Sequence, residues 1–160
     1  MLVDKMNSLL NIFNGTDMLI AAHCEDQETI KNNIEKYKQK YKGADDIPIS
    51  AHPSIRSVPA CYASSELAVR LAKIAGARLH ILHVSTAKEL QLFSDEPLAN
   101  KNITAEACVA HLLFTLTHYN SLGARIKCNP AVKRKTDREA LRTAVNSGPV
   151  SYTHLRAHET

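Results

Sequence analysis

The sequence predicts an α/β fold built on a parallel sheet, and three observations support this prediction. Two short apolar runs, at residues 18–24 and 78–84, have the length and composition of buried strands. Each run is followed by a segment whose apolar residues recur at helical spacing. Glycine and proline residues separate these segments, so predicted strands and helices alternate along the chain.

The run at 78–84 is apolar almost throughout, which is typical of a strand buried on both faces. Thr86 and Glu89 follow it with the spacing of a capping box, which predicts a helix from Thr86 to Phe93. In the helix at 60–75, we expect Leu71 and Ile74 to face the core. Further helices are predicted at 3–14, 27–42, 112–119 and from 136 onward, a third strand at 102–108, and a short extended piece at 125–129.

Composition and charge exclude several classes of protein. A hydrophobic share of 44% and a charged share of 22% are those of a globular protein. The net charge of +4 comes largely from one lysine-rich helix, without the clustered arginines or interleaved aromatics of a nucleic-acid interface. No apolar run reaches the roughly 18 residues of a membrane span. The start lacks a signal-peptide layout, and the four scattered cysteines indicate reduced thiols, so we expect a cytoplasmic protein.

The length of the chain predicts part of a barrel. A (β/α)8 barrel uses about 30 residues for each strand–helix unit, so 160 residues hold roughly five units. Residues 1–148 carry the alternating pattern and are expected to form this partial barrel. Residues 149–160 have neither a buried run nor a helical stripe, and we expect a foreign-looking or disordered tail there.

Two histidines are the first candidates for a functional site. His23 and His83 each stand at the carboxyl end of a predicted strand, just before a helix. Parallel strands place such ends at one edge of the sheet, where ligands collect in α/β proteins, so the two imidazoles should converge. Neutral imidazole is a common ligand of zinc-like ions, although a catalytic zinc normally has three protein ligands. The pattern therefore favours a metal site that needs further ligands.

Other polar residues carry weaker signals. His80 lies three residues before His83, so we expect it on the opposite face, packed against helices outside the barrel. His111 could lie at the mouth of the site or on a helix surface. Glu106 is a candidate buried carboxylate, with a structural role as the alternative. Asn129, before a proline, could present its amide to a polar ligand or belong to an ordinary turn.

Five segments together resemble the dihydroorotase family, of the cyclic amidohydrolase branch of the amidohydrolases, and especially its Bacteroidetes-type members. The resemblance extends to about Gly148, and the order of the segments makes it specific. The segments are 22–26 (AHCED), 52–57 (HPSIRS), 78–86 (RLHILHVST), 103–106 (ITAE), and 127–130 (KCNP) with 137–142 (DREALR).

The resemblance implies a metal-dependent (β/α)8 barrel with a two-zinc centre that interconverts N-carbamoyl-L-aspartate and dihydroorotate in pyrimidine biosynthesis. His23 and His83 match the metal ligands that end strands five and six, and Asn129 matches a substrate-binding residue. The implied partner is this small-molecule substrate, with a homo-oligomer left open and neither nucleic acid nor membrane involved.

Departures from the family pattern limit what the chain should do alone. The resemblance puts the strand-one histidines before Met1 and the acid–base aspartate beyond Gly148, so no catalytic residue is assigned. We expect weak zinc binding, no activity of the chain alone, and low solubility because an open sheet exposes its edges. The alternatives are an allantoinase or dihydropyrimidinase, or a non-catalytic dihydroorotase-like scaffold subunit, against which the presence of both histidines argues.

Overall fold

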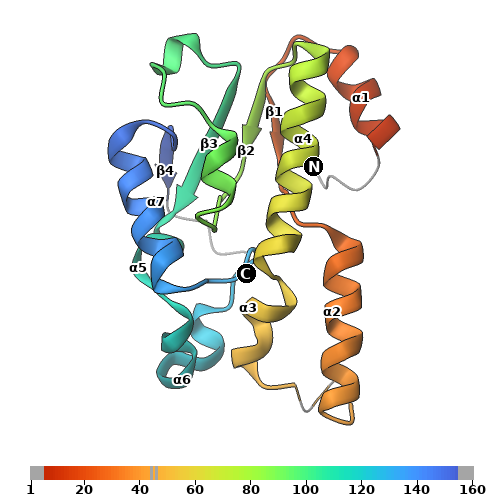
Figure 1. The fold of residues 1–160 in the computed structure, drawn as a ribbon, viewed down its shortest axis with the longest axis vertical. Helices are drawn as coiled ribbons and strands as arrows, with labels where there is room; N and C mark the ends of the chain where they lie inside the picture. Colours follow the sequence, from red (N-terminus) through yellow and green to blue (C-terminus); the bar gives the residue numbers. More distant parts are fainter. Residues whose placement is uncertain (1–5, 44, 46, 155–160) are drawn as a thin grey trace.

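The computed structural model describes residues 6–43, 45 and 47–154. Its centre is a parallel sheet in the order β1-β2-β3-β4, with strands side by side and helices packed around them (Figure 1). The α/β fold with a partial parallel sheet is therefore confirmed. The strands are β1 (Ile20–Ala22), β2 (Leu79–Ile81), β3 (Ile103–Cys108) and β4 (Tyr152–His154).

The helices connect the strands and cover one face of the sheet. In Figure 1, α4 lies beside β1 and β2 and α7 beside β4, while α2, α3, α5 and α6 gather beyond the carboxyl ends of the strands. The α-helices are α1 (Met6–Asn14), α2 (Gln27–Lys40), α3 (His52–Ile55), α4 (Val58–Ala75), α5 (Val109–Leu113), α6 (Tyr119–Leu122) and α7 (Lys135–Ser147). Short 3₁₀ turns are η1 (Ile49–Ala51), η2 (Glu89–Leu92), η3 (Leu98–Asn100), η4 (Leu116–His118) and η5 (Gly123–Ile126).

The hydrophobic core lies between this face of the sheet and helices α1, α4 and α7. Leu79 and Ile81 of β2 are fully buried there, and Ala105 and Ala107 of β3 lie on the same face. All three residues of β2 are buried, as expected for a strand enclosed on both sides. The helices contribute Leu9 and Phe13 from α1, Ala68, Val69, Leu71 and Ala72 from α4, and Leu141 and Ala144 from α7.

Local capping sets where the two helices nearest the strand ends begin. The Asp26 carboxylate accepts a hydrogen bond from the Thr29 amide at 2.8 Å and starts α2 directly after β1. Ser57 caps α4 in the same way through the Ala60 amide. Gly76 ends α4 with a left-handed φ of 65°, which glycine adopts without the steric cost of a side chain. These caps fix the lengths of the connections between β1 and β2.

Several local predictions were wrong. Residues 86–93 form only the short η2, although the Glu89 amide does bond the Thr86 hydroxyl at 3.2 Å. Residues 125–129 contain the end of η5 and no strand. Ile74 is 69% exposed and lies outside the buried stripe of α4, although Ala75 and Ala77 after it still pack on the core.

The tail also differs from its prediction. Tyr152–His154 pair with β3 as the fourth parallel strand, and the Ser151 amide donates to the Ala105 carbonyl at 2.8 Å. Val150 is 4% exposed and belongs to the core. Backbone pairing places this segment in the sheet even though its side-chain pattern carries no strand signal. The remaining part of the predicted tail, 155–160, lies outside the described residues.

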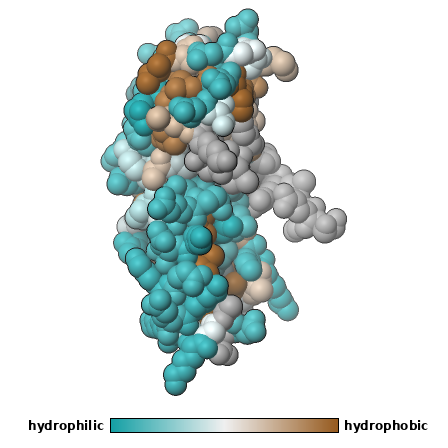
Figure 2. Space-filling view, turned by 90° about the vertical axis from the view of Figure 1, so that its right-hand side faces the viewer, coloured by the Kyte–Doolittle hydropathy of each residue, from teal (hydrophilic) through white to brown (hydrophobic). Residues whose placement is uncertain are grey.

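One face of the molecule has a more apolar and a more polar half. Figure 2 shows apolar side chains mainly in the upper part of the molecule and hydrophilic ones over the lower part. The exposed large apolar residues include Met6 and Ile12 of α1, Met18 and Leu19 before β1, and Ile74 of α4. No helix in the described part of the chain has the length and apolar character needed to cross a membrane.

Glu89 is a carboxyl group placed inside the protein. It is 2% exposed and accepts hydrogen bonds from the hydroxyls of Ser65 at 2.7 Å and Thr86 at 2.8 Å. Burial raises the pKa of Glu89 above its ordinary value, although these hydrogen bonds and the charge of Lys133 act in the opposite direction. The folded protein therefore holds the Glu89 proton more tightly than the unfolded chain does.

We expect Glu89→Gln to gain stability relative to the wild type as the pH rises. A raised folded pKa stabilises the wild type fully below the unfolded pKa of glutamate, and that stability is lost as the pH passes through the folded pKa. Urea unfolding at several pH values between 4 and 8 measures the difference. Glu139→Gln is the control of opposite sign, since the Arg138 hydrogen bond lowers the pKa of this exposed carboxyl. A pH-independent difference for Glu89→Gln would contradict the assignment.

Candidate metal centre

Two histidine side chains meet at the carboxyl ends of β1 and β2. His23 directly follows β1, and His83 lies two residues beyond the end of β2. Their Nδ1 and Nε2 atoms, respectively, are 2.8 Å apart, and the rings make an edge contact with centroids 4.7 Å apart. His83 is 7% exposed, whereas His23 is half-buried and open on one side. The convergence expected from the two strand ends is thus present in the structure.

A buried carboxylate supports His23 from behind. Glu25 is fully buried, and its Oε2 lies 3.3 Å from His23 Nε2. The guanidinium of Arg56, from the loop before α4, forms an ion pair with the same carboxylate oxygen. Burial alone would raise the pKa of Glu25, but the hydrogen bond with His23 and the charge of Arg56 outweigh it and leave the pKa lowered. Glu25 is therefore an anion that orients the His23 ring.

His83 is held by its backbone as well as by its ring. Its φ is 42°, in the left-handed region that a residue with a side chain rarely adopts. The His83 amide donates to Glu106 Oε1 at 3.2 Å, and the next amide, of Val84, donates to the Glu106 carbonyl at 2.8 Å. Such conformations persist where surrounding contacts enforce them, and they concentrate at functional sites.

His80 lies on the sheet face opposite the helices, which corrects the prediction that it packs against them. Its Nδ1 and Thr104 Oγ1 are 2.8 Å apart, and its Nε2 lies 3.1 Å from Glu106 Oε2. The register of β2 and β3 pairs His80 with Thr104, so both side chains share this face. Glu106, the predicted buried carboxylate, is 9% exposed and links His80 to the backbone of His83.

The histidine pair fits a metal ion in part. Two imidazole nitrogens bound to one tetrahedral zinc ion at about 2.0–2.1 Å would stand about 3.3 Å apart. The observed 2.8 Å between His23 and His83 therefore requires only a small opening of the rings. Glu25 behind His23 is the kind of carboxylate that accompanies metal-binding histidines. Among the residues that the structure describes, no group of three or more His, Cys, Asp or Glu side chains is arranged to hold an ion.

The remaining candidate residues surround this region in different ways. Asn129 is half-buried, between η5 and the buried residues that precede α7. His111 is 3% exposed, and its Nε2 lies 2.9 Å from the Pro130 carbonyl, so it is neither at a helix surface nor exposed at a site mouth. His52 Nε2 lies 2.9 Å from the Cys128 carbonyl. Both histidines thus contact the backbone on either side of Asn129.

Sequence reasoning missed the part that Arg56 and Glu25 take in the site. Arg56 precedes α4, thirty-one positions beyond Glu25, and no spacing rule joins the two residues. In the sequence, their role is indicated only by their positions in the segments 22–26 and 52–57, which resemble the dihydroorotase family. Burial raises the thiol pKa of Cys24 and of Cys61 to about 12, which disfavours the thiolate form of these two side chains.

Comparison with curated proteins identifies relatives over most of the chain. No protein-family profile matches it. The dihydroorotase of Halalkalibacterium halodurans is 31% identical over 138 residues, which are 85% of this chain and 30% of that protein. The dihydroorotase of Bacillus caldolyticus is 30% identical over the same length and the same shares. The chain therefore spans about 30% of the length of the curated relatives that it matches.

Solved structures of cyclic amidohydrolases share the fold. The L-hydantoinase (dihydropyrimidinase) from Arthrobacter aurescens superposes with a TM-score of 0.84 at 19% identity, over 96% of this chain and 36% of that one. The D-hydantoinase (dihydropyrimidinase) from Thermus sp. gives a TM-score of 0.81 at 15% identity, over 97% and 36%. At these identities the likeness concerns the fold. By sequence the chain is homologous to a part of the dihydroorotases, and its α/β fold is that of a part of the solved hydantoinases.

Proposed function

We propose that this chain is part of a dihydroorotase in which His23 and His83 bind one zinc ion of a two-metal centre. The observation that carries the proposal is the approach of His23 Nδ1 to His83 Nε2, at 2.8 Å, across the ends of adjacent parallel strands. The identity of about 30% to curated dihydroorotases supports the choice of reaction. That reaction is the reversible cyclisation of N-carbamoyl-L-aspartate to dihydroorotate.

The contact of His23 with the Glu25 carboxylate favours one tautomer of the histidine pair. Since Glu25 is an anion near His23 Nε2, that nitrogen carries the proton and Nδ1 presents its lone pair. His83 Nε2 is then the donor in the contact between the rings. For both facing nitrogens to bind a cation, the His83 proton has to move to Nδ1 or leave. A zinc ion bound there would supply a Lewis acid that polarises an amide carbonyl and lowers the pKa of water.

The chain's own residues would position the reacting groups. Arg56 and Glu25 fix the orientation of the His23 ring, and Glu106 fixes the backbone at His83. Asn129 is the residue that we assign to substrate binding. The small dianionic substrate would bind at the open side of His23. We place the protein in the cytoplasm, in pyrimidine biosynthesis, with a homo-oligomer as a further possibility for the whole enzyme.

A hydantoinase or dihydropyrimidinase is the second candidate. The specific observation in its favour is the fold, since the hydantoinases superpose with TM-scores of 0.81 and 0.84. The identities of 15% and 19% are lower than those to the dihydroorotases, which is why we rank it second. A non-catalytic scaffold is disfavoured, because it would have no use for a histidine pair backed by a buried ion pair.

A chimaeric enzyme tests the proposed function. The matching 138-residue stretch of the Halalkalibacterium halodurans dihydroorotase would be replaced by the corresponding residues of this chain. We expect turnover of dihydroorotate, and a fall in kcat/KM of at least about 100-fold on His23→Asn or His83→Asn. His118→Asn, in a half-buried histidine of η4, is the matched control. Turnover of dihydrouracil in place of dihydroorotate would support the second candidate, and unchanged activity of the two variants would refute the metal assignment.

A further inference from the structure

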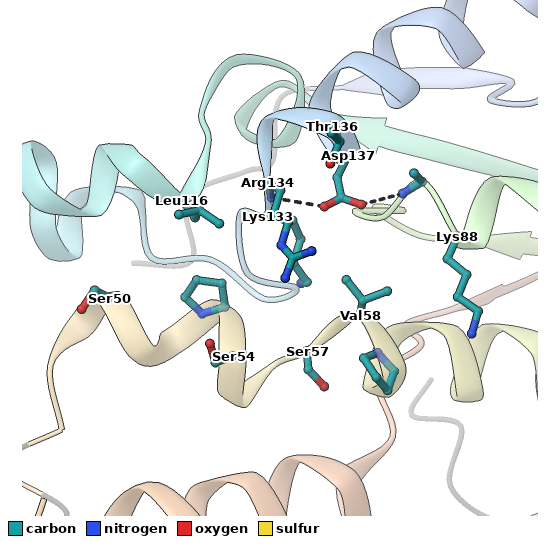
Figure 3. Close-up of a pocket in the computed structure, with 13 residues that line it drawn as sticks. Ser50, Ser54, Ser57, Val58, Lys88, Leu116, Lys133, Arg134, Thr136 and Asp137 are labelled. Atoms are coloured by element: carbon teal, nitrogen blue, oxygen red, sulfur yellow. Dashed lines mark hydrogen bonds between the residues drawn. The ribbon is translucent and has the colours of Figure 1, made fainter. Parts of the chain in front are cut away.

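A cavity of about 610 Å³ opens between the start of α4 and the start of α7. Figure 3 shows Ser50, Ser54 and Val58 on one side of it and Lys133 and Arg134 on the other, with Lys88 at its edge. Neither His23, His83 nor Asn129 lines this cavity. A ligand of this cavity can therefore be tested independently of the proposed function.

Lys133 is the unusual residue in the wall of the cavity. It is only 5% exposed, and its Nζ makes one hydrogen bond, to the Ala131 carbonyl at 2.9 Å. No carboxylate among the described residues lies within 4 Å of it, although its charge acts on Glu25 and Glu89 at longer range. An ammonium group has three donors, and burying it without a partner for each is costly. The remaining donors of Lys133 are available to a group in the cavity.

The position of Lys133 is fixed before any ligand arrives. Its carbonyl accepts a hydrogen bond from the Leu116 amide at 2.7 Å, and Ala131 and Val132 before it are fully buried. The backbone next to it is held too, since the Arg134 amide donates to Asp137 Oδ2 at 3.2 Å. The Lys133 side chain is itself buried and held by the hydrogen bond from Nζ to Ala131, so it loses little conformational freedom when it binds an anion.

The charges around the cavity are mostly positive. Lys88, Lys133 and Arg134 contribute three cations, against the single carboxylate of Asp137. Both Asp137 oxygens already accept backbone amides, from Ala87 at 2.9 Å and Arg134 at 3.2 Å. Lys88 Nζ stands 4.2 Å from the centre of the Tyr62 ring, which holds it at the edge. The amino-terminal ends of α4 and α7 also line the cavity, and their dipoles add to the positive potential.

We infer that this cavity binds a small organic anion, through a phosphate or carboxylate group placed on Lys133 and Arg134. The hydroxyls of Ser50 and Ser54 are polar partners on the facing side, and Val58 and Leu116 offer apolar contacts for the body of the ligand. The volume of the cavity lies within the range typical of small-molecule sites, and its largely polar lining suits a charged ligand. The inference goes beyond the proposed reaction, because no residue assigned to that reaction lines the cavity.

Calorimetric titration of the full 160-residue chain with inorganic phosphate, and separately with succinate, tests the inference. We expect saturable binding of at least one anion, weakened at least about tenfold by Lys133→Met, because charge-assisted hydrogen bonds are lost. The tighter of the two anions identifies the group that the site prefers. Lys73→Met, which removes an exposed lysine in the last turn of α4, is the matched control and should bind as the wild type does.

A second variant keeps the test decisive if Lys133→Met does not fold. Arg134 is exposed, so Arg134→Gln should leave the fold intact and still weaken anion binding. Amide chemical shifts of Ala87 and Lys88 should move during the titration, because both residues line the cavity. The inference would be overturned if neither phosphate nor succinate bound saturably. Equal anion affinities of the Arg134→Gln and Lys73→Met variants would overturn it as well.

Discussion

The purified chain is expected to bind Zn²⁺ weakly, and His83→Asn should weaken this binding at least about 100-fold. Two imidazoles are fewer ligands than a catalytic zinc normally has, which limits the affinity, and loss of either removes half of the set. Asparagine is the replacement of choice because it tolerates the left-handed φ of 42° at this position better than most residues. His23→Asn should have the same effect from the other strand.

Glu25→Gln removes the carboxylate that orients the His23 ring and leaves both histidines in place. The carboxylate contacts His23 Nε2 at 3.3 Å on the side away from His83, so its loss should reduce zinc affinity by only about 10-fold. Isothermal titration with Zn²⁺ measures all three variants, and His118→Asn is the control that should not differ from the wild type. If His23→Asn and His83→Asn both bound zinc as the wild type does, the pair would not be the metal site.

Leu71→Ala should destabilise the chain by about 2–5 kcal/mol. Leu71 is 1% exposed and lies in the core between α4 and the sheet, so truncation removes buried contacts and leaves a cavity. Ile74→Ala, one turn later on the same helix, should cost less than about 0.5 kcal/mol because Ile74 is 69% exposed.

Urea unfolding followed by circular dichroism compares the two variants under one set of conditions. The two substitutions remove a similar apolar volume from one helix, so differences in helix propensity largely cancel. Equal losses of unfolding free energy would mean that α4 is rotated or extended relative to the arrangement described above. Equal losses would also reinstate the interpretation drawn from periodicity, in which both residues face the core.

Much of the fold was predictable because the strands are short, apolar and followed by capped helices. The periodicity at Leu71 and Ile74 shows where such reasoning ends. A repeat of three and four residues places both on one stripe, but it does not indicate how wide the buried part of that stripe is. β4 shows the converse, since Tyr152–His154 are held by hydrogen bonds between backbones, which a side-chain pattern does not encode.

The sequence predicted which residues of the strands share a face. It did not predict which face of the sheet carries the helices. Alternation along a strand places His80 opposite Leu79 and Ile81, which the structure bears out. A strand apolar on both sides does not reveal which face carries the helices, and for this reason His80 was assigned to the wrong face. The turn at His83 was equally hidden, because a left-handed conformation at a histidine depends on the Glu106 contact from another strand.

The contact between His23 and His83 has a consequence for the stability of the fold. The two residues are 60 positions apart in the sequence. They follow β1 and β2, which are neighbouring strands of only three residues each. A cation shared by both rings would act as a cross-link that closes this long loop. A cation bound only by the native state raises the free energy of unfolding by an amount that increases with its affinity and its concentration. The pair that we assign to metal binding would thus also form a reversible cross-link between the ends of β1 and β2.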